Sequence, residues 1–301
     1  ASEFAATDLF DQQYGTVTTP VVTTGFPVDF FIERSPNGTD GNYFFNRLTG
    51  KKYMQSNSAN AESTGGLSRF FDFSDGVMSS WGQAASYLIY SFRRAPGFFD
   101  VVAYTGTGGS TNTINHNLGV VPEMMLVKRR DGSDVWWVYH KDMTGTPHNA
   151  YMRLDATAAV VTNNDAGFGD TAPTATQFTV GGFPSGSGQA HIAYLFATVA
   201  GISKVGTYSG TGSAIDVDCG FSNGARFVLL KRTDDAASWY LFDSERGIVA
   251  GNDSKLNLDT TAAQTTNTDY IDPLSSGFTI TSTATNELNQ SGGTYIFYAI
   301  A

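Results

Sequence analysis

Apolar and polar residues alternate over short stretches along most of the chain. The segment "STNTINHN" from Ser110 places Thr and Ile between polar side chains, as a half-buried strand does. The segment "EMMLVKR" from Glu123 is an almost continuous apolar run, typical of a strand covered on both faces. Gly-rich and Asp-Gly turn signals recur about every 8–15 residues, and no window keeps a helical apolar period. The pattern predicts an antiparallel sandwich or barrel.

The pattern repeats along the chain. "YTGTGGSTNTINHN" from Tyr104 matches "YSGTGSAIDVDCG" from Tyr208, and "LDATAA" from Leu154 matches "LDTTAA" from Leu258. Both pairs are 104 positions apart. A fixed period of this kind indicates tandem copies of one unit.

A third, more diverged copy lies in the first hundred residues. "PVDFFIERS" from Pro27 matches "PEMMLVKRR" and "ARFVLLKRT" in the later copies, and "NYFFNRLTG" matches "WWVYHKDMTG". The sequence therefore predicts an all-β chain of three tandem antiparallel β-sandwich-like domains of about 100 residues each. Their predicted ranges are 1–96, which includes an N-terminal extension, 97–200 and 201–301.

The connections between the copies are short. "RRAPGF" and "ATVAGISK" leave little room for a flexible tether, so we expect domains stacked end to end with restricted mutual motion. The only helical candidates are "DATAAV" from Asp155 and "DTTAAQ" from Asp259, each long enough for one turn of α- or 3₁₀-helix.

Composition narrows the class of protein. A hydrophobic content of 41% is enough to form cores, whereas a net charge of −10 argues against binding a nucleic-acid backbone. No apolar run approaches the roughly 20 residues of a membrane span, so no membrane insertion is expected. With a single cysteine, Cys219, an internal disulfide is excluded.

Few residues suggest chemistry, and we expect no enzyme activity, no catalytic residue, no cofactor and no metal site. The histidines are not spaced as metal ligands, and two of them fit structural positions: His116 in a polar turn and His140 at an exposed strand end. Cys219 fits a small core residue. Acidic pairs at Asp216–Asp218, Asp234–Asp235 and Asp269–Asp272 lack the spaced loop of a strong Ca²⁺ site, so solvated loop charge is the simpler interpretation.

Aromatic residues are the most suggestive binding feature. They form 13% of the chain, and each copy carries an aromatic strand at the same place. Neighbouring side chains on a strand point to opposite faces, so one aromatic of each pair could be exposed and stack on a sugar ring. The alternative is that both faces are packed. The candidate glycan-binding or interface residues are Trp136, Trp137, Tyr139, Trp239 and Tyr240.

Several segments resemble a known family. "HNLGVVPEMMLVKRR", "YLIYSFRRAPGFFDVVAYTGTG", "CGFSNGARFVLLKRT" and "SGGTYIFYAIA" are similar to a tandem domain of virion proteins of tailed bacteriophages, often marine ones, of the tail or fibre type. The resemblance runs from about residue 27 to the end. It implies a structural or adhesion component with no catalytic motif, located in the virion and assembled in the host cytoplasm.

Three functional hypotheses follow. The first is a tail-fibre or adhesin-type component that contacts a host-surface glycan or protein. The second is a purely architectural virion protein, a capsid decoration or tail spacer. The third is a glycan depolymerase, which needs paired carboxylates in a groove. Other virion proteins are the expected partners, and the fibre resemblance favours a homo-oligomer, with a trimer as the expected form.

Overall fold

The computed structural model describes residues 4–64, 69–79, 86–284 and 286–301. It is nearly all β, built from several antiparallel sheets, which confirms the predicted all-β class. Three larger sheets share one strand order, and we call the parts of the chain that form them copy 1, copy 2 and copy 3.

The larger sheet of copy 1 has the order β1 (Phe10–Tyr14), β8 (Leu88–Phe92), β3 (Phe30–Arg34), β4 (Tyr43–Asn46), β5 (Tyr53–Gln55). The sheet of copy 2 runs β9 (Phe99–Thr105), β16 (Ala190–Phe196), β11 (Met124–Arg129), β12 (Trp136–His140), β13 (Ala150–Arg153), β14 (Val161–Thr162). That of copy 3 runs β17 (Ser203–Ser209), β25 (Thr294–Ile300), β19 (Phe227–Arg232), β20 (Tyr240–Asp243), β21 (Asp253–Asn257), β22 (Thr265–Thr268).

A smaller sheet accompanies each larger one. In chain order of the copies, these sheets are β2 (Val22–Thr23), β7 (Gly76–Ser79), β6 (Arg69–Phe70); β10 (Thr111–Asn115), β15 (Gln177–Gly181); and β18 (Ile215–Asp218), β24 (Gly277–Ile280), β23 (Ile271–Leu274). In copy 3 the two layers enclose a core in which Val217 and Phe278 meet Val228 and Phe297. Each copy is thus a two-layer, sandwich-like unit.

Helices are short and lie outside the predicted segments. They are η1 (Ala6–Asp8), η2 (Pro147–Asn149), η3 (Phe183–Ser185) and α1 (Asn286–Asn289). The prediction of a helical turn at 155–160 and 259–264 is wrong, because both segments are irregular or extended. Their backbone groups pair with the following copy instead: the Val160 N–H donates to Thr233 O at 2.9 Å, and the Ala237 N–H donates to Thr157 O at 2.9 Å.

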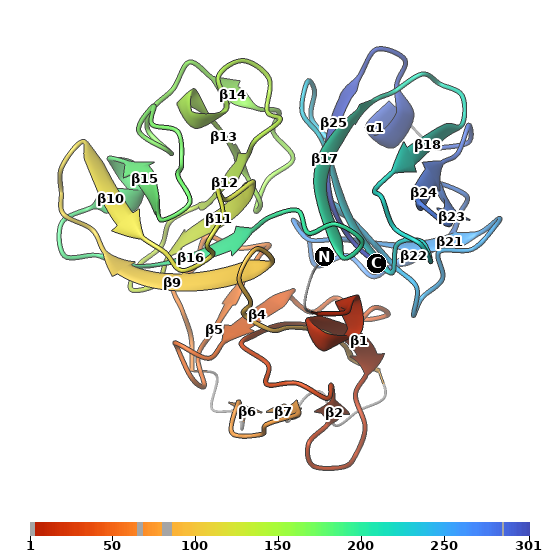
Figure 1. The fold of residues 1–301 in the computed structure, drawn as a ribbon, viewed down its shortest axis with the longest axis horizontal. Helices are drawn as coiled ribbons and strands as arrows, with labels where there is room; N and C mark the ends of the chain where they lie inside the picture. Colours follow the sequence, from red (N-terminus) through yellow and green to blue (C-terminus); the bar gives the residue numbers. More distant parts are fainter. Residues whose placement is uncertain (1–3, 65–68, 80–85, 285) are drawn as a thin grey trace.

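The three copies surround a common centre (Figure 1). The predicted end-to-end stack is therefore wrong. One apolar cluster runs through all three larger sheets, and among its members are Phe30, Ile32 and Phe44 of copy 1, Met124, Leu126 and Trp136 of copy 2, and Phe227, Leu229 and Trp239 of copy 3.

The alternation of side chains along the third strand of each larger sheet explains this arrangement. In β19, Phe227 and Leu229 point to the common core, whereas Val228 and Leu230 point to the copy's own smaller sheet. A sheet that is apolar on both faces needs two covers. The smaller sheet covers one face, and the neighbouring copies cover the other.

The shared core predicts that a single copy does not fold as a stable monomer. A fragment of residues 201–301 would expose Phe227, Leu229, Trp239, Tyr298 and Ile300, each at most 5% exposed in the full chain. Full burial of each such side chain contributes about 1.5–3 kcal/mol. We expect the fragment to self-associate or to lack a sharp unfolding transition, measured by sedimentation and near-UV circular dichroism beside the full chain. A monomeric fragment with the Tm of the full chain would contradict the shared core.

Candidate functional site

The five predicted aromatic residues are all buried. Their exposed fractions are 0% for Trp136, 4% for Trp137, 6% for Tyr139, 1% for Trp239 and 2% for Tyr240. Of the two alternatives, the packed one is found: both faces of β12 and of β20 are covered, and neither aromatic of a pair is exposed. No ring face at these positions is available to a sugar.

Two of these residues join neighbouring copies. The Trp136 Nε1–H donates to Gln55 O of copy 1 at 2.8 Å, and the Trp239 Nε1–H donates to Arg153 O of copy 2 at 2.8 Å. In copy 1, Asn42 takes the equivalent position and donates from Nδ2 to Leu258 O of copy 3 at 3.0 Å. The aromatic strand is therefore part of the contact between copies.

A buried cation lies beside each of these contacts, at the end of the third strand. The ammonium of Lys128 donates to Ala59 O at 2.9 Å and to Asp134 O at 2.8 Å. Lys231 donates to Thr157 O at 3.1 Å, and Arg34 Nη2 donates to Thr261 O at 3.0 Å. All three side chains belong to residues with no exposed surface. Sequence reasoning missed them, although a basic residue ends the third strand in every copy.

A third set of contacts between copies involves Asn46, His140 and Asp243. Each of these residues pairs with the first residue of the third strand of its own copy. Asn46 Nδ2 donates to Tyr194 Oη at 3.0 Å, and Tyr90 Oη donates to Asp243 Oδ2 at 2.7 Å. His140 accepts the Asp142 N–H at Nδ1, so its Nε2 carries the proton and faces Phe297 O at 3.3 Å. The prediction of an exposed His140 is wrong: the residue is fully buried, and burial lowers its pKa to about 4.

The remaining candidates have structural partners. His116 is buried and accepts the Leu118 N–H at Nδ1. Cys219 is a buried core residue, as predicted, and burial raises the pKa of its thiol to about 12. In the acidic pairs, Asp216 accepts the Thr279 hydroxyl and Asp234 pairs with Arg232. Within the described ranges, no group of three or more His, Cys, Asp or Glu residues could hold a metal ion.

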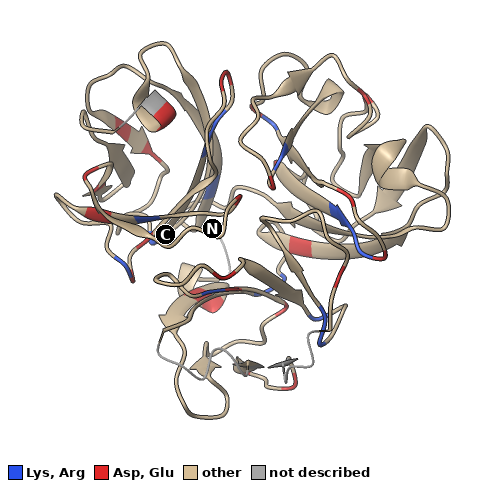
Figure 2. Ribbon diagram, turned by 180° about the vertical axis from the view of Figure 1, so that it is seen from behind, with Lys and Arg blue, Asp and Glu red and all other residues tan. Residues whose placement is uncertain are grey.

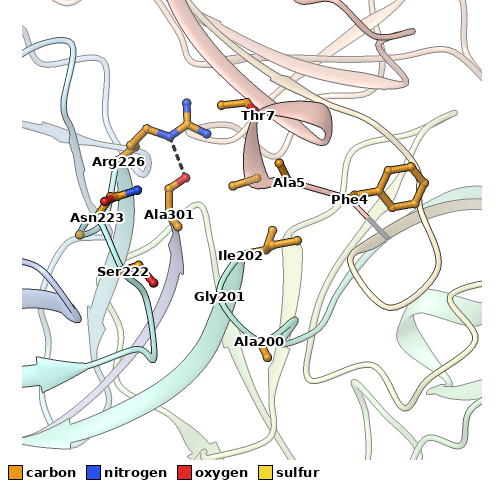
Figure 3. Close-up of a pocket in the computed structure, with 12 residues that line it drawn as sticks. Phe4, Ala5, Thr7, Ala200, Gly201, Ile202, Ser222, Asn223, Arg226 and Ala301 are labelled. Carbon is orange, nitrogen blue, oxygen red and sulfur yellow. Dashed lines mark hydrogen bonds between the residues drawn. The ribbon is translucent and has the colours of Figure 1, made fainter. Parts of the chain in front are cut away.

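A hollow with a volume of about 600 Å³ lies between the N-terminal segment that begins at Phe4 and Ala301. We call it the junction hollow. Segments 4–7, 200–202 and 222–226 line it together with Ala301, and Figure 3 shows the Arg226 side chain directed to Ala301. The Arg226 Nε–H donates to Ala301 O at 2.7 Å. Most of the side chains that line the hollow are small. Among the described residues that line it, Arg226 is the one with a charged side chain.

Exposed charge and apolar surface are otherwise dispersed. Acidic and basic residues are interspersed over all three copies (Figure 2). Among the described residues, Phe183 is the one large aromatic that is strongly exposed, at 67%, and its ring stacks on Trp137 with centroids 5.8 Å apart. No helix in the described part of the chain has the length and hydropathy of a membrane-spanning helix.

Comparison with known families gives one result. A family model described as "Domain of unknown function (DUF7483)" matches residues 89–301, more than two thirds of the chain. The chain belongs to this family. No curated protein matches it. The DUF7483 match begins in β8, the strand that ends copy 1, and covers copies 2 and 3 completely. It therefore includes both buried lysines and Arg226, together with eight of the eleven residues that line the void at the common centre.

The buried lysines predict a pH dependence of stability. Burial lowers the pKa of Lys231 to about 8, below the value of about 10.4 for an unfolded chain. Between these values the unfolded state binds more protons than the folded state, so the contribution of Lys231 to stability rises with pH. We expect the free energy of unfolding of the wild type, relative to Lys231→Met, to increase by about 1–2 kcal/mol from pH 7 to 9.5.

Urea denaturation at each pH measures the free energy of unfolding of both proteins. Taking the difference between them cancels the contributions of the other titrating groups, which the two proteins share. The matched control is Lys51→Met, because Lys51 is exposed, and its difference from the wild type should change little over the same range. A flat difference for Lys231→Met would show that the buried ammonium stays protonated.

Proposed function

We propose that this protein is a non-enzymatic structural component of a tailed-bacteriophage particle, and that it acts by contact with other virion proteins. The resemblance of its sequence to virion proteins of the tail or fibre type supports the phage assignment. The closed ring of three copies with one common core supports the architectural role, because the five aromatic residues that would serve a glycan-binding surface are buried, and two of them form contacts between copies.

The homotrimer stays a prediction, because the structure of a single chain does not show how chains associate.

Localisation on the particle tests this proposal. In a phage that encodes this chain, we expect antibodies against the purified protein to label intact particles at a fixed position in electron micrographs. We also expect the purified protein not to bind host cells. Absence of the chain from purified particles by mass spectrometry would overturn the proposal.

A host-contacting role is the second candidate, and Phe183 is the observation that favours it. Its exposed ring lies in the glycine-rich segment 181–188 and stacks on Trp137, an arrangement that could hold a sugar ring. If this role is correct, Phe183→Ala should reduce binding of the protein to host cells at least tenfold without changing Tm. Leu48→Ala, at another exposed apolar position, is the matched control. Equal cell binding by both variants would argue against the role of Phe183.

A further inference from the structure

The turn that follows the third strand of each larger sheet differs in chemistry between the copies. Three positions after the buried cation, the chain reads Asn37–Gly38 in copy 1, Asp131–Gly132 in copy 2 and Asp234–Asp235 in copy 3. In copies 2 and 3 the first carboxylate of the turn is held in an ion pair: Arg129 Nε lies 2.8 Å from Asp131 Oδ1, and Arg232 Nη2 lies 2.9 Å from Asp234 Oδ2. Copy 1 has a neutral amide at this position.

An Asn–Gly pair can deamidate in water without an enzyme. The Gly38 nitrogen, which no Cβ shields, attacks Cγ of Asn37. The N–Cγ bond forms and the nitrogen gives its proton to solvent, while the Cγ–Nδ2 bond breaks and ammonia leaves. Water then opens the resulting five-membered succinimide at either carbonyl. One opening gives aspartate at position 37, and the other gives isoaspartate, in which the main chain runs through Cβ and Cγ.

The attacking nitrogen is held weakly at this turn. Asn37 is exposed, and the Gly38 N–H donates to Ser35 O at 3.2 Å, at the long limit of such bonds. The sequence has a second Asn–Gly pair, Asn223–Gly224. There the glycine is buried, and its N–H donates to Ser275 O at 2.7 Å. The Gly38 nitrogen is therefore released from its hydrogen bond more easily than that of Gly224.

A neighbouring copy polarises the amide that is attacked. Gln264 of copy 3 donates from Nε2 to Asn37 Oδ1 at 2.9 Å, and its backbone N–H donates to Pro36 O at 2.7 Å. Negative charge develops on Oδ1 when the Gly38 nitrogen attacks Cγ. A donor already directed at this oxygen stabilises the tetrahedral intermediate more than the ground-state amide. In the described part of the chain, the side-chain amide of Asn223 accepts no such bond.

The turn lies beside the buried cation that joins copy 1 to copy 3. Arg34 Nη2 donates to Gly38 O at 3.4 Å within copy 1 and to Thr261 O at 3.0 Å in copy 3. Isoaspartate adds one main-chain atom between positions 37 and 38. The Gly38 carbonyl then moves away from the guanidinium, whose burial makes every lost acceptor costly.

We propose that Asn37 is a site of spontaneous deamidation, that Gln264 of the neighbouring copy promotes the reaction, and that the isoaspartate product weakens the contact between copy 3 and copy 1. The modification depends on the fold and on water alone. It is therefore independent of whether the protein occurs in a virion.

Peptide mapping by mass spectrometry tests the site. Trypsin releases Asn37 in the peptide 35–47 and Asn223 in the peptide 205–226, and replacement of an amide by a carboxylate is read as a gain in mass. After incubation of the folded chain at mildly alkaline pH, we expect Asn37 to deamidate at least fivefold faster than Asn223. In urea the two rates should become similar, because both sites are then unfolded Asn–Gly pairs. Equal rates in the folded chain, or faster reaction at Asn223, would overturn the proposal.

Two substitutions test the mechanism. Gln264→Ala should slow the reaction of Asn37 at least threefold in the folded chain and leave it unchanged in urea, whereas Gln177→Ala, at an exposed glutamine of copy 2, should have no effect in either state. Gly38→Ala should slow the reaction at least tenfold, because its Cβ shields the nitrogen. The nearest atom to that Cβ is the Ser35 hydroxyl oxygen at 2.8 Å, which can rotate away. An undiminished rate in Gln264→Ala would refute the role of the neighbouring copy.

Ageing of the purified chain measures the effect on the contact between copies. The wild type is incubated beside Asn37→Gln, whose longer side chain forms the corresponding ring much more slowly. We expect the Tm of the wild type to fall as isoaspartate forms, and that of Asn37→Gln to stay constant. Hydrogen exchange at the Gln264 N–H, which is bonded to Pro36 O, should become at least tenfold faster in the aged wild type. Unchanged Tm and exchange after isoaspartate has formed at position 37 would show that the contact tolerates the product and would overturn its weakening.

Discussion

Burial of the inner faces of the three larger sheets against one another is the constraint on which the rest of the structure depends. Each larger sheet is apolar on both faces, but its smaller sheet covers only one. Two sheets packed face to face would satisfy a pair of copies and leave a third uncovered. Three sheets around a common centre cover one another completely, and the void at the centre is only about 20 Å³. The ring is thus the arrangement that leaves no inner face in water.

Apolar burial brings the copies together, and polar contacts fix how they meet. Apolar contact is not directional, so it does not prevent one sheet from sliding over another. The buried cation at the end of each third strand removes that freedom, because its N–H groups reach backbone carbonyls of the preceding copy only in one register. A slip would leave a charge buried without partners, which costs several kcal/mol. The loops that supply these carbonyls also form backbone hydrogen bonds to the neighbouring copy, from the Val160 N–H to Thr233 O and from the Gln264 N–H to Pro36 O. One loop in each of these copies therefore contributes to both kinds of contact.

The sequence patterns predicted the local structure better than the assembly. Alternation and turn signals were sufficient for the all-β class, and the period of 104 residues revealed related units. Alternation also predicted correctly that Trp136 and Trp137 point to opposite faces of their strand. It left the exposure of these residues open, because a pattern along one strand does not say what covers its second face. The prediction of a helical turn at 155–160 was wrong for a similar reason. The Thr157 carbonyl in this segment accepts hydrogen bonds from copy 3, and such tertiary contacts override a weak helix propensity.

The differences between the copies are concentrated where the chain does not continue from one copy to the next. At the two linked junctions the linker itself holds neighbouring copies at high effective concentration. The junction between copy 3 and copy 1 has no such tether in this chain. There the aromatic contact is replaced by Asn42, which donates to three carbonyls of copy 3.

The same junction also contains a buried ion pair. Arg246 Nε lies 2.6 Å from Asp243 Oδ2, whose carboxylate also accepts the hydroxyl of Tyr90 from copy 1. Hydrogen bonds to charged groups contribute about 1.5–3 kcal/mol, more than the 0.5–1.5 kcal/mol of neutral ones. The bond from Tyr90 to the Asp243 carboxylate is therefore a charge-assisted contact across the junction that has no covalent connection. Arg226 stands at the rim of this junction, just before the third strand of copy 3. The residues at that position in copies 1 and 2 are Asp29 and Glu123, whose carboxylates accept N–H groups of linker residues.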